Sequence, residues 1–151
     1  MRGAQNRLSR HVLMAPMDAA LMRNVEATVY PWIGGTWKSA IDFEGGSVGF
    51  FVLIDERVVS LCFSVFVSDG CHAIDMLTIE KFRGLGLAKA VASAFMDECV
   101  HRCLKPTWDC YEHNLPSRGL AQVLGFRPKN EFPVYSCQRT IWRFSCDFPS
   151  R

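Results

Sequence analysis

Three apolar runs separated by two short turns constrain this chain more than any other feature. The runs cover residues 47–54, 58–67 and 71–79, and along the second run two sets of side chains alternate, as they do in a strand with two different faces. The turns, at residues 55–57 and 68–70, are short enough to favour hairpins. The three runs therefore predict an antiparallel meander at the centre of the fold.

A glycine-containing turn follows the third run and leads into a long helix. Residues 83–88 read Arg-Gly-Leu-Gly-Leu-Ala, and residues 84–104 are predicted to form a helix with a wide apolar face that Pro106 ends. A strand that turns through glycines into a helix leaves backbone N–H groups exposed at the positive end of the helix dipole. The turn therefore predicts a seat for a phosphate or pyrophosphate, with Arg83 at its mouth.

Two better-known phosphate loops are excluded at this turn. A Walker A loop requires Gly-Lys-Ser or Gly-Lys-Thr, which the chain lacks. A dinucleotide fingerprint requires a third small residue, and Lys89 stands at that position. Alternating strands and helices do not precede the turn either, so the anion seat belongs to another kind of fold.

The remaining elements are predicted from helix and strand signals. A helix is expected over residues 16–28, where Pro16 and Asp18 suit the first turn, and a short helical turn over residues 39–43. Beyond the long helix the pattern predicts a strand, a second helix and a two-stranded hairpin, over residues 108–113, 116–124, 134–137 and 140–146. This order predicts an α+β fold, a single domain over residues 1–151 whose mixed, mainly antiparallel central sheet is flanked by helices.

The composition is that of a globular chain and narrows the classes of partner. Hydrophobic residues make up 49% and charged residues 21%, and the formal net charge is +2 without a run of Lys or Arg, so we expect no nucleic-acid partner. No apolar stretch reaches the roughly 18 residues that a membrane helix needs. The polar start of the chain has no apolar signal core, so we expect no membrane association.

Seven cysteines at irregular spacing lie mostly within apolar runs. We interpret them as reduced, buried thiols of a cytoplasmic protein. Cys99 and Cys103 share one helical face with His101 nearby, but no second ligand pair with zinc-like spacing accompanies them. Structural burial is favoured over a metal site, and no metal is predicted.

Two motifs give the chain a resemblance to the GNAT N-acetyltransferase superfamily. Residues 83–88 match its cofactor motif, Gln/Arg-x-x-Gly-x-Gly/Ala, at a strand-to-helix turn. A second motif, Asn-x-x-Ser/Ala-x-x-Leu-Tyr/Ala-x-x-x-Gly-Phe, is matched by Asn114, Ser117, Leu120, Ala121, Gly125 and Phe126. The resemblance covers residues 46–126, and residues 32–39 and 106–110 are similar to one bacterial branch of undefined acceptor.

The resemblance implies acetyl-CoA as the cofactor and direct attack by an amine in a ternary complex. The pyrophosphate would lie on the glycine turn, and the pantetheine arm would run beside the third strand, in a slot between that strand and residues 108–113. Asn114 would line the slot, and Ser117 would lie near the thiol. The implied cofactor-binding residues are Met76, Leu77, Thr78, Arg83, Gly84, Leu85, Gly86, Leu87, Ala88, Asn114 and Ser117.

The proton chemistry departs from the superfamily pattern. Many GNAT enzymes protonate the departing thiolate from a Tyr, and that position holds Ala121 here. Release of an unassisted thiolate is one alternative, and the other candidate donors are Ser117, Tyr111 and Tyr135.

The general base is expected among carboxylates near the slot. Asp75 and Glu112 are candidates, because a partly buried carboxylate can relay the proton of the amine. The alternatives are that Asp75 caps a strand bulge and that Glu112 is a solvated charge at a strand end; His113 is favoured as a surface residue. The candidate catalytic residues are Glu112, Ser117 and Asp75.

The acceptor is expected to be a small-molecule amine of unspecified identity. Tyr30, Trp32 and Trp37 precede the meander and either wall the acceptor pocket or belong to the core. Two rival functions stay open, an acyl-CoA-binding sensor without turnover and an interaction domain of the same fold that has lost the cofactor. Because a C-terminal strand or hairpin often pairs across a dimer in this fold, a homodimer is also an open alternative.

Overall fold

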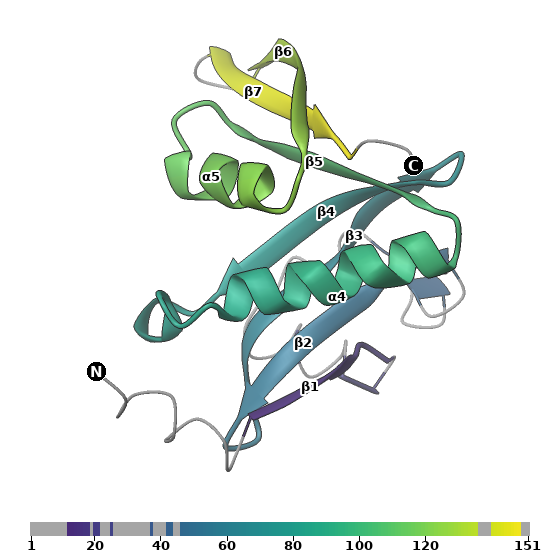
Figure 1. Cartoon of the computed structure of the whole chain (residues 1–151), viewed down its shortest axis with the longest axis vertical. Helices are drawn as coiled ribbons and strands as arrows, with labels where there is room; N and C mark the ends of the chain where they lie inside the picture. Colours follow the sequence, from purple (N-terminus) through teal and green to yellow (C-terminus); the bar gives the residue numbers. More distant parts are fainter. Residues whose placement is uncertain are drawn as a thin grey trace.

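The computed structural model describes residues 12–18, 20, 21, 25, 37, 42, 43, 46–135 and 140–148. Its centre is a seven-stranded sheet with the order β1-β2-β3-β4-β5-β7-β6 (Figure 1). β4 and β5 are parallel, whereas the other neighbouring pairs are antiparallel, which confirms the predicted mixed, mainly antiparallel sheet. The strands are β1 (Val12–Pro16), β2 (Gly49–Ile54), β3 (Arg57–Ser68), β4 (Cys71–Thr78), β5 (Lys105–Tyr111), β6 (Arg127–Tyr135) and β7 (Thr140–Asp147).

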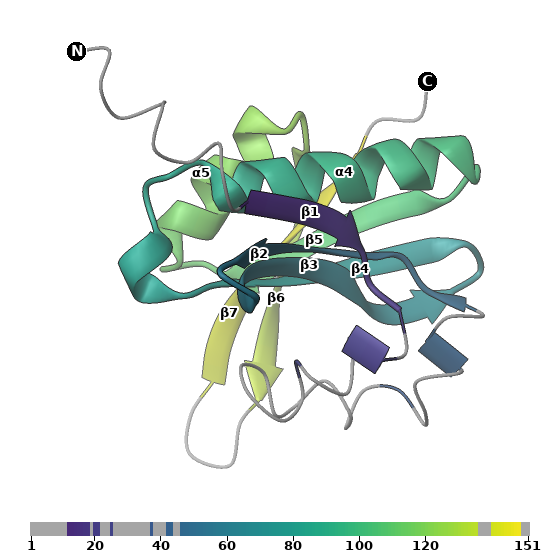
Figure 2. The ribbon, with the colours of Figure 1, turned by 90° about the horizontal axis from the view of Figure 1, so that it is seen from below.

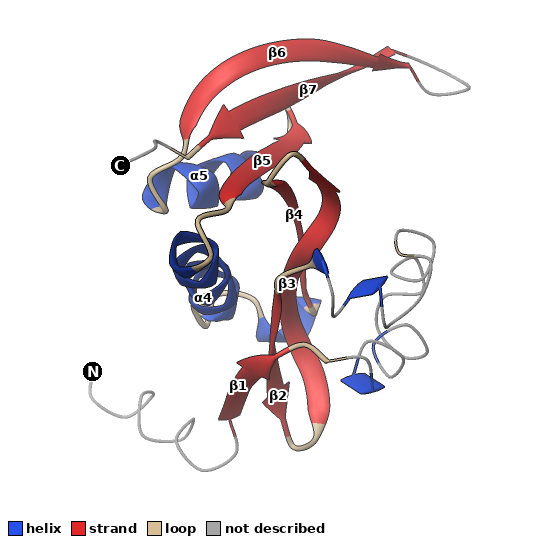
Figure 3. Cartoon of the chain, turned by 90° about the vertical axis from the view of Figure 1, so that its right-hand side faces the viewer, coloured by secondary structure: helices blue, strands red, loops and turns tan. Residues whose placement is uncertain are grey.

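Two helices lie on one face of this sheet. They are α4 (Leu87–His101) and α5 (Leu115–Val123), and a 3-10 turn, η1 (Glu80–Phe82), precedes α4 (Figure 3). Figure 2 shows α4 covering β2, β3 and β4. α4 forms the crossover between β4 and β5, as a parallel pair of strands requires.

The sheet has a separate apolar cluster on each face, because successive strand residues point to opposite sides. The cluster under the helices contains Phe95 of α4, Trp108 of β5 and Phe126. The cluster on the opposite face contains Phe43 and Phe63. We call the first of these the helix cluster and the other the second cluster. The helix cluster reaches the region between β4 and β5, because it includes Ile74 and Trp108.

The N-terminal part differs from the sequence prediction at its first element. Pro16 ends strand β1, which pairs with β2, whereas it was predicted to start a helix. An edge strand tolerates a proline because one side of its backbone faces no partner strand. Asp18 follows, and its Oδ1 accepts the N–H of Leu21 at 2.8 Å. Ala20, Leu21 and Val25 are helical, so the described part of the predicted helix begins after Asp18.

The starts of α4, β5 and β6 differ from the sequence prediction because of glycines and prolines. α4 begins at Leu87 and not at residue 84, because Gly84 and Gly86 have φ values of +78° and +79°, which a helix does not allow. β5 begins at Lys105 and runs through a proline that was taken only as a helix stop. β6 is longer than the predicted residues 134–137, because its prolines obscure a strand that lies at the sheet edge.

The six described cysteines are free. Four are buried, as predicted, but Cys103 is exposed and Cys71 is partly exposed; Cys137 lies outside the described residues. Burial raises the pKa of Cys62, and it raises that of Cys99 to about 12, so both remain protonated, unreactive thiols at neutral pH.

No group of three or more His, Cys, Asp or Glu side chains able to hold a metal ion occurs among the described residues. In that same part of the chain, no helix is both long and apolar enough to cross a membrane.

Candidate active site

β4 and β5 separate partway along their length. Their pairing runs from Cys71 opposite Lys105 to Ile74 opposite Trp108 and then stops, although β4 continues to Thr78 and β5 to Tyr111. Figure 1 shows the two strands diverging toward the start of α4. The sheet is therefore open at one end of the only parallel pair among the described strands.

Two cavities occupy this opening. The larger, about 430 Å³, reaches from the glycine turn to the first turn of α5. The smaller, about 180 Å³, lies between the separated ends of β4 and β5. Met76, Asn114 and Ser117 line both cavities, so the two adjoin each other. We call these two adjoining cavities the slot.

The β4 backbone presents hydrogen-bonding groups to the slot. Ile79 N–H donates to Val59 O of β3, so by the alternation of a strand the polar groups of Met76 and Thr78 point the other way. Met76 N–H donates to Asp75 Oδ1 at 2.8 Å, and Thr78 O accepts from Arg83 Nε at 3.3 Å. The side chains of Asp75 and Arg83 thus bond to backbone groups of β4 that a bound ligand could also use.

The glycine turn offers a row of backbone donors. A Cβ built on Gly84 or Gly86 would meet no atom within 4 Å, so the space over the turn is open. Within the described part of the chain, the N–H groups of residues 84–88 donate to no acceptor, as is normal at a helix start. Together with the positive end of the α4 dipole, these donors fit a phosphate group.

Cationic side chains flank the turn. Arg83 is exposed, lines the larger cavity and forms no ion pair with a described carboxylate. Lys89 is exposed on α4 and lines the same cavity. Its position directly after the glycine motif was the signal that could have identified it.

Asn114 and Ser117 line the side of the slot that α5 forms. Asn114 is the N-cap of α5, and its Oδ1 accepts Ser117 N–H at 3.3 Å. Ser117 Oγ accepts the indole N–H of Trp108 at 3.0 Å, a bond that sequence reasoning did not predict. Ala121, one turn further along α5, is 1% exposed and packs in the helix cluster, so it lines neither cavity.

Two carboxylates border the smaller cavity. Asp75 and Asp109 both line it, one from each strand, directly after the last paired positions. Their neighbours Ile74 and Trp108 belong to the helix cluster, so both carboxylates face the side of the sheet away from α4. The larger cavity is thus bordered by cations and backbone donors, and the smaller one by carboxylates.

The other predicted residues are distributed unevenly. Leu77, Leu87 and Ala88 line the larger cavity, but Leu85 is 47% exposed and lines neither. Glu112 is exposed and lines neither cavity, and its carbonyl accepts Nη1 of Arg118 at 3.2 Å.

Two further candidates lie outside the slot. His113 is exposed and stacks on Tyr111, with ring centroids 5.6 Å apart. Trp37 donates its indole N–H to Ser64 O and packs edge-on against Phe43, within the second cluster and away from both cavities. Tyr30, Trp32 and Tyr135 have no described side chains.

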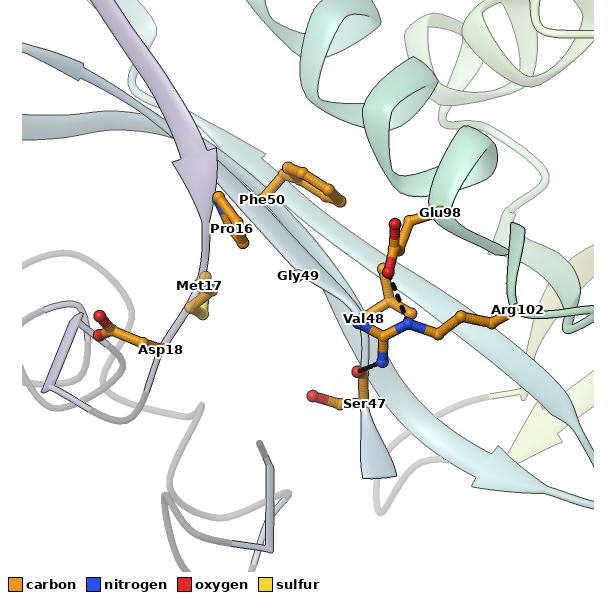
Figure 4. A pocket seen from close by; sticks show the side chains of 9 residues that line it. All are labelled: Pro16, Met17, Asp18, Ser47, Val48, Gly49, Phe50, Glu98 and Arg102. Atoms are coloured by element: carbon orange, nitrogen blue, oxygen red, sulfur yellow. Dashed lines mark hydrogen bonds and ion pairs between the residues drawn. The ribbon is translucent and has the colours of Figure 1, made fainter. Parts of the chain in front are cut away.

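A separate pocket of about 210 Å³ lies at the other end of α4, between β1, β2 and the helix (Figure 4). Arg102 donates to Glu98 Oε1 and, at 3.3 Å, to Ser47 O. Asp18 also lines this pocket, and its carboxylate caps a helix, as described above. The polar groups of this pocket hold elements together and do not converge on the empty space.

Known proteins resemble this chain in sequence and in fold. The family model for GNAT acetyltransferase matches residues 1–135. The chain is 39% identical over 99 residues to YdfB of Bacillus subtilis (strain 168), an uncharacterized N-acetyltransferase; the match covers 66% of this chain and 38% of YdfB. A GCN5-related N-acetyltransferase-like protein from Streptococcus suis 89/1591 has a TM-score of 0.73 and 27% identity, over 93% of this chain and 53% of that one.

A third likeness concerns the fold alone. YncA from Salmonella typhimurium, whose structure contains its cofactor acetyl-CoA, has a TM-score of 0.73 at 13% identity, over 91% of this chain and 93% of that one. The chain therefore spans nearly all of this structure, but only about half or less of the first two relatives.

Proposed function

Because the chain belongs to the GNAT acetyltransferase family, we propose that it is an N-acetyltransferase that uses acetyl-CoA to acetylate a small-molecule amine by direct attack in a ternary complex. The observation that carries this proposal is the slot. One end has the backbone donors and cations that suit a pyrophosphate, and the other has carboxylates that suit a protonated amine. The two ends adjoin, because Met76, Asn114 and Ser117 line both cavities.

The residues around the larger cavity fit the cofactor. The N–H groups of residues 84–88 and the Arg83 side chain would hold the phosphates, and the slot-facing groups of Met76 and Thr78 would pair with the amides of the pantetheine arm. The amide nitrogen of Asn114 is left to face the slot, because its oxygen caps α5. Acetyl-CoA, when bound, supplies an acetyl group activated as a thioester.

Asp75 is the proposed base. It borders the smaller cavity, where the amine would arrive, and a carboxylate can take a proton from an ammonium group directly or through one water. Its bond to Met76 N–H holds it beside the smaller cavity. Asp109 would add attraction for a cationic acceptor. We therefore expect the acceptor to be a positively charged amine.

Direct attack is favoured over a covalent enzyme intermediate. Cys110 is the cysteine that lines the slot among the described residues, and it is 6% exposed with its side chain in the helix cluster. A thiol buried in an apolar cluster is a poor nucleophile, because burial disfavours the thiolate.

A second candidate function is binding of acyl-CoA without turnover. Ala121 in place of a tyrosine, together with Glu112 outside the slot, favours it. The two functions are separated by measuring acetyl-CoA affinity by calorimetry and thiol release with a panel of amines. The enzyme binds the cofactor and releases thiol with at least one amine, whereas the sensor binds without release; absence of binding contradicts both.

Two further expectations belong to the same proposal. The free cysteines support a cytoplasmic protein.

The position of β6 at the sheet edge leaves one side of that strand for a second copy, which supports a homodimer. Light scattering at several protein concentrations measures the oligomeric state, and a monomer at every concentration contradicts the dimer.

A further inference from the structure

We propose that Trp108 and Ser117 form a donor pair that aims the Ser117 hydroxyl at the leaving sulfur and stabilises its negative charge, in a chain whose Ala121 cannot protonate the thiolate. This inference rests on the proposed function, because it requires a thioester in the slot. Ser117 is the group that would contact the sulfur, and Trp108 is a positioning residue that acts through it.

The geometry of the pair fixes the direction of the hydroxyl. An indole N–H can only donate, so the 3.0 Å bond makes Ser117 Oγ the acceptor. The hydroxyl hydrogen must then point elsewhere, and within the described residues it meets no acceptor. Because Ser117 lines both cavities, the open direction is the slot.

Trp108 is held firmly enough to impose this direction. It is 2% exposed and packs edge-on against Phe126, with ring centroids 5.3 Å apart. It also occupies the last position of β5 that pairs with β4, opposite Ile74. The indole N–H is therefore fixed before any ligand arrives, and it costs no reorganisation during the reaction.

The place of the sulfur follows from the two cavities. The phosphates suit the glycine turn and the amine suits the carboxylates, so the reacting atoms must meet where the cavities join. Ser117 lies at that junction, in the first turn of α5. Negative charge is favoured at the N-terminal turn of a helix, which adds to the effect of the hydroxyl.

The chemical role is stabilisation of charge and not transfer of a proton. Acetyl transfer forms a C–N bond, breaks the C–S bond, leaves the electron pair on sulfur and releases the amine proton to the base and then to water. A serine hydroxyl is a much weaker acid than a thiol, so it does not give up its proton to the thiolate. It donates a hydrogen bond to the charge, and the donor is made stronger by the bond that its oxygen accepts from Trp108.

The test measures binding without catalysis. Coenzyme A and dethio-coenzyme A, in which hydrogen replaces the thiol, are titrated by calorimetry at pH 7 and at a pH above the pKa of the coenzyme A thiol. The affinity ratio of the two ligands reports the contact at sulfur. In the parent protein we expect the ratio to favour coenzyme A more strongly at the higher pH, by about tenfold.

Separate variants test the contributions of Ser117 and Trp108 to this preference. Ser117→Ala and Trp108→Phe should each remove most of this preference at high pH while dethio-coenzyme A binds as before, and Ser117→Thr should keep it. Ser68→Ala, at an exposed serine at the end of β3, is the matched control and should change nothing. An unchanged preference in Ser117→Ala overturns the proposal. A parent protein that binds neither ligand contradicts the proposed function instead.

A second measurement keeps the Trp108 part testable even where Trp108→Phe is unstable. The indole N–H signal of a tryptophan in the proton NMR spectrum depends on its hydrogen bond. In Ser117→Ala, with all four tryptophans present, we expect one indole signal to move upfield. Four unmoved signals show that the indole does not hold the hydroxyl, and overturn its positioning role.

Discussion

The two ends of the β4–β5 pair use their polar groups in opposite ways. At the closed end, where the strands are paired, His72 is 3% exposed and bonds to Ser64 Oγ at 2.9 Å. Arg102 and Glu98 tie the last turn of α4 to Ser47 just beyond. At the open end, the glycine turn, Arg83 and Ser117 direct donors into the slot. Groups that satisfy one another stabilise the fold, and groups left facing a cavity are available to a ligand.

The sharpest test of this contrast is at the closed end. His72→Ala removes a buried ring and its bond to Ser64 Oγ, while Ser64 keeps its bonds to Val48, so we expect a loss of about 3 kcal/mol in the free energy of unfolding. This corresponds to a drop in Tm of roughly 6–12 °C. Calorimetry measures both. Below the new Tm the affinity for acetyl-CoA should stay within about twofold of the parent value, and a parallel loss of affinity would contradict the separation of the two ends.

The converse test is at the open end. Arg83→Glu reverses the charge beside the glycine turn, and acetyl-CoA should bind at least about tenfold more weakly, a loss of about 1.4 kcal/mol. The Tm should change little, because Arg83 is exposed. Arg57→Glu makes the same change at the exposed start of β3, outside the slot, and serves as the control. If both variants lose the same affinity, general charge and not the turn controls binding.

A smaller effect is expected from the backbone of the turn. Gly86→Ala places a Cβ on a residue with φ of +79°, which should cost about 1–2 kcal/mol of stability. Gly119 lies within α5 with nothing near its Cβ position, so Gly119→Ala should instead stabilise by about 0.5–1 kcal/mol. Chemical denaturation gives both values. Shifts of the same sign in the two variants would refute the requirement for a left-handed residue at the turn.

The smallest effect is a dependence on pH. Burial lowers the pKa of His72, and the nearby positive charge of Arg102 lowers it further. Above pH about 6.5 the histidine is neutral in both folded and unfolded chains and contributes its full stability. Below that pH the unfolded chain takes up the proton first, so stability falls until the folded pKa is reached. The difference in the free energy of unfolding between the parent protein and His72→Gln should therefore decrease from pH 7.5 to pH 5. A difference that stays constant over this range would contradict the lowered pKa of His72.

The sequence predicts the meander well, because its turns are short and its hairpins local. The glycine turn was also predictable, since few other arrangements need Gly84 and Gly86 after a strand. β1 and most of β6 were missed, because prolines argue against strands unless the strand is known to be at an edge.

Within the site, the parts that depend on distant elements could not be predicted. The bond from Trp108 to Ser117 joins a strand to a helix, and neither residue signals the other. The resemblance implied a slot between β4 and residues 108–113, but it did not predict that Asp109 lies beside the slot. Glu112 was predicted to be near the slot on the basis of neighbouring residues alone, and the turn after β5 carries it to the surface.

The short parallel pairing also has a consequence for how the chain folds. In the described sheet, β1–β4 and β5–β7 are joined as strands only between Cys71–Ile74 and Lys105–Trp108. Each group consists largely of hairpins, which close early because their contacts are local, whereas the joint must wait for the whole α4 crossover. We expect two cooperative units that form separately and dock late. Hydrogen exchange should then show the amides along this joint opening before those of either hairpin group.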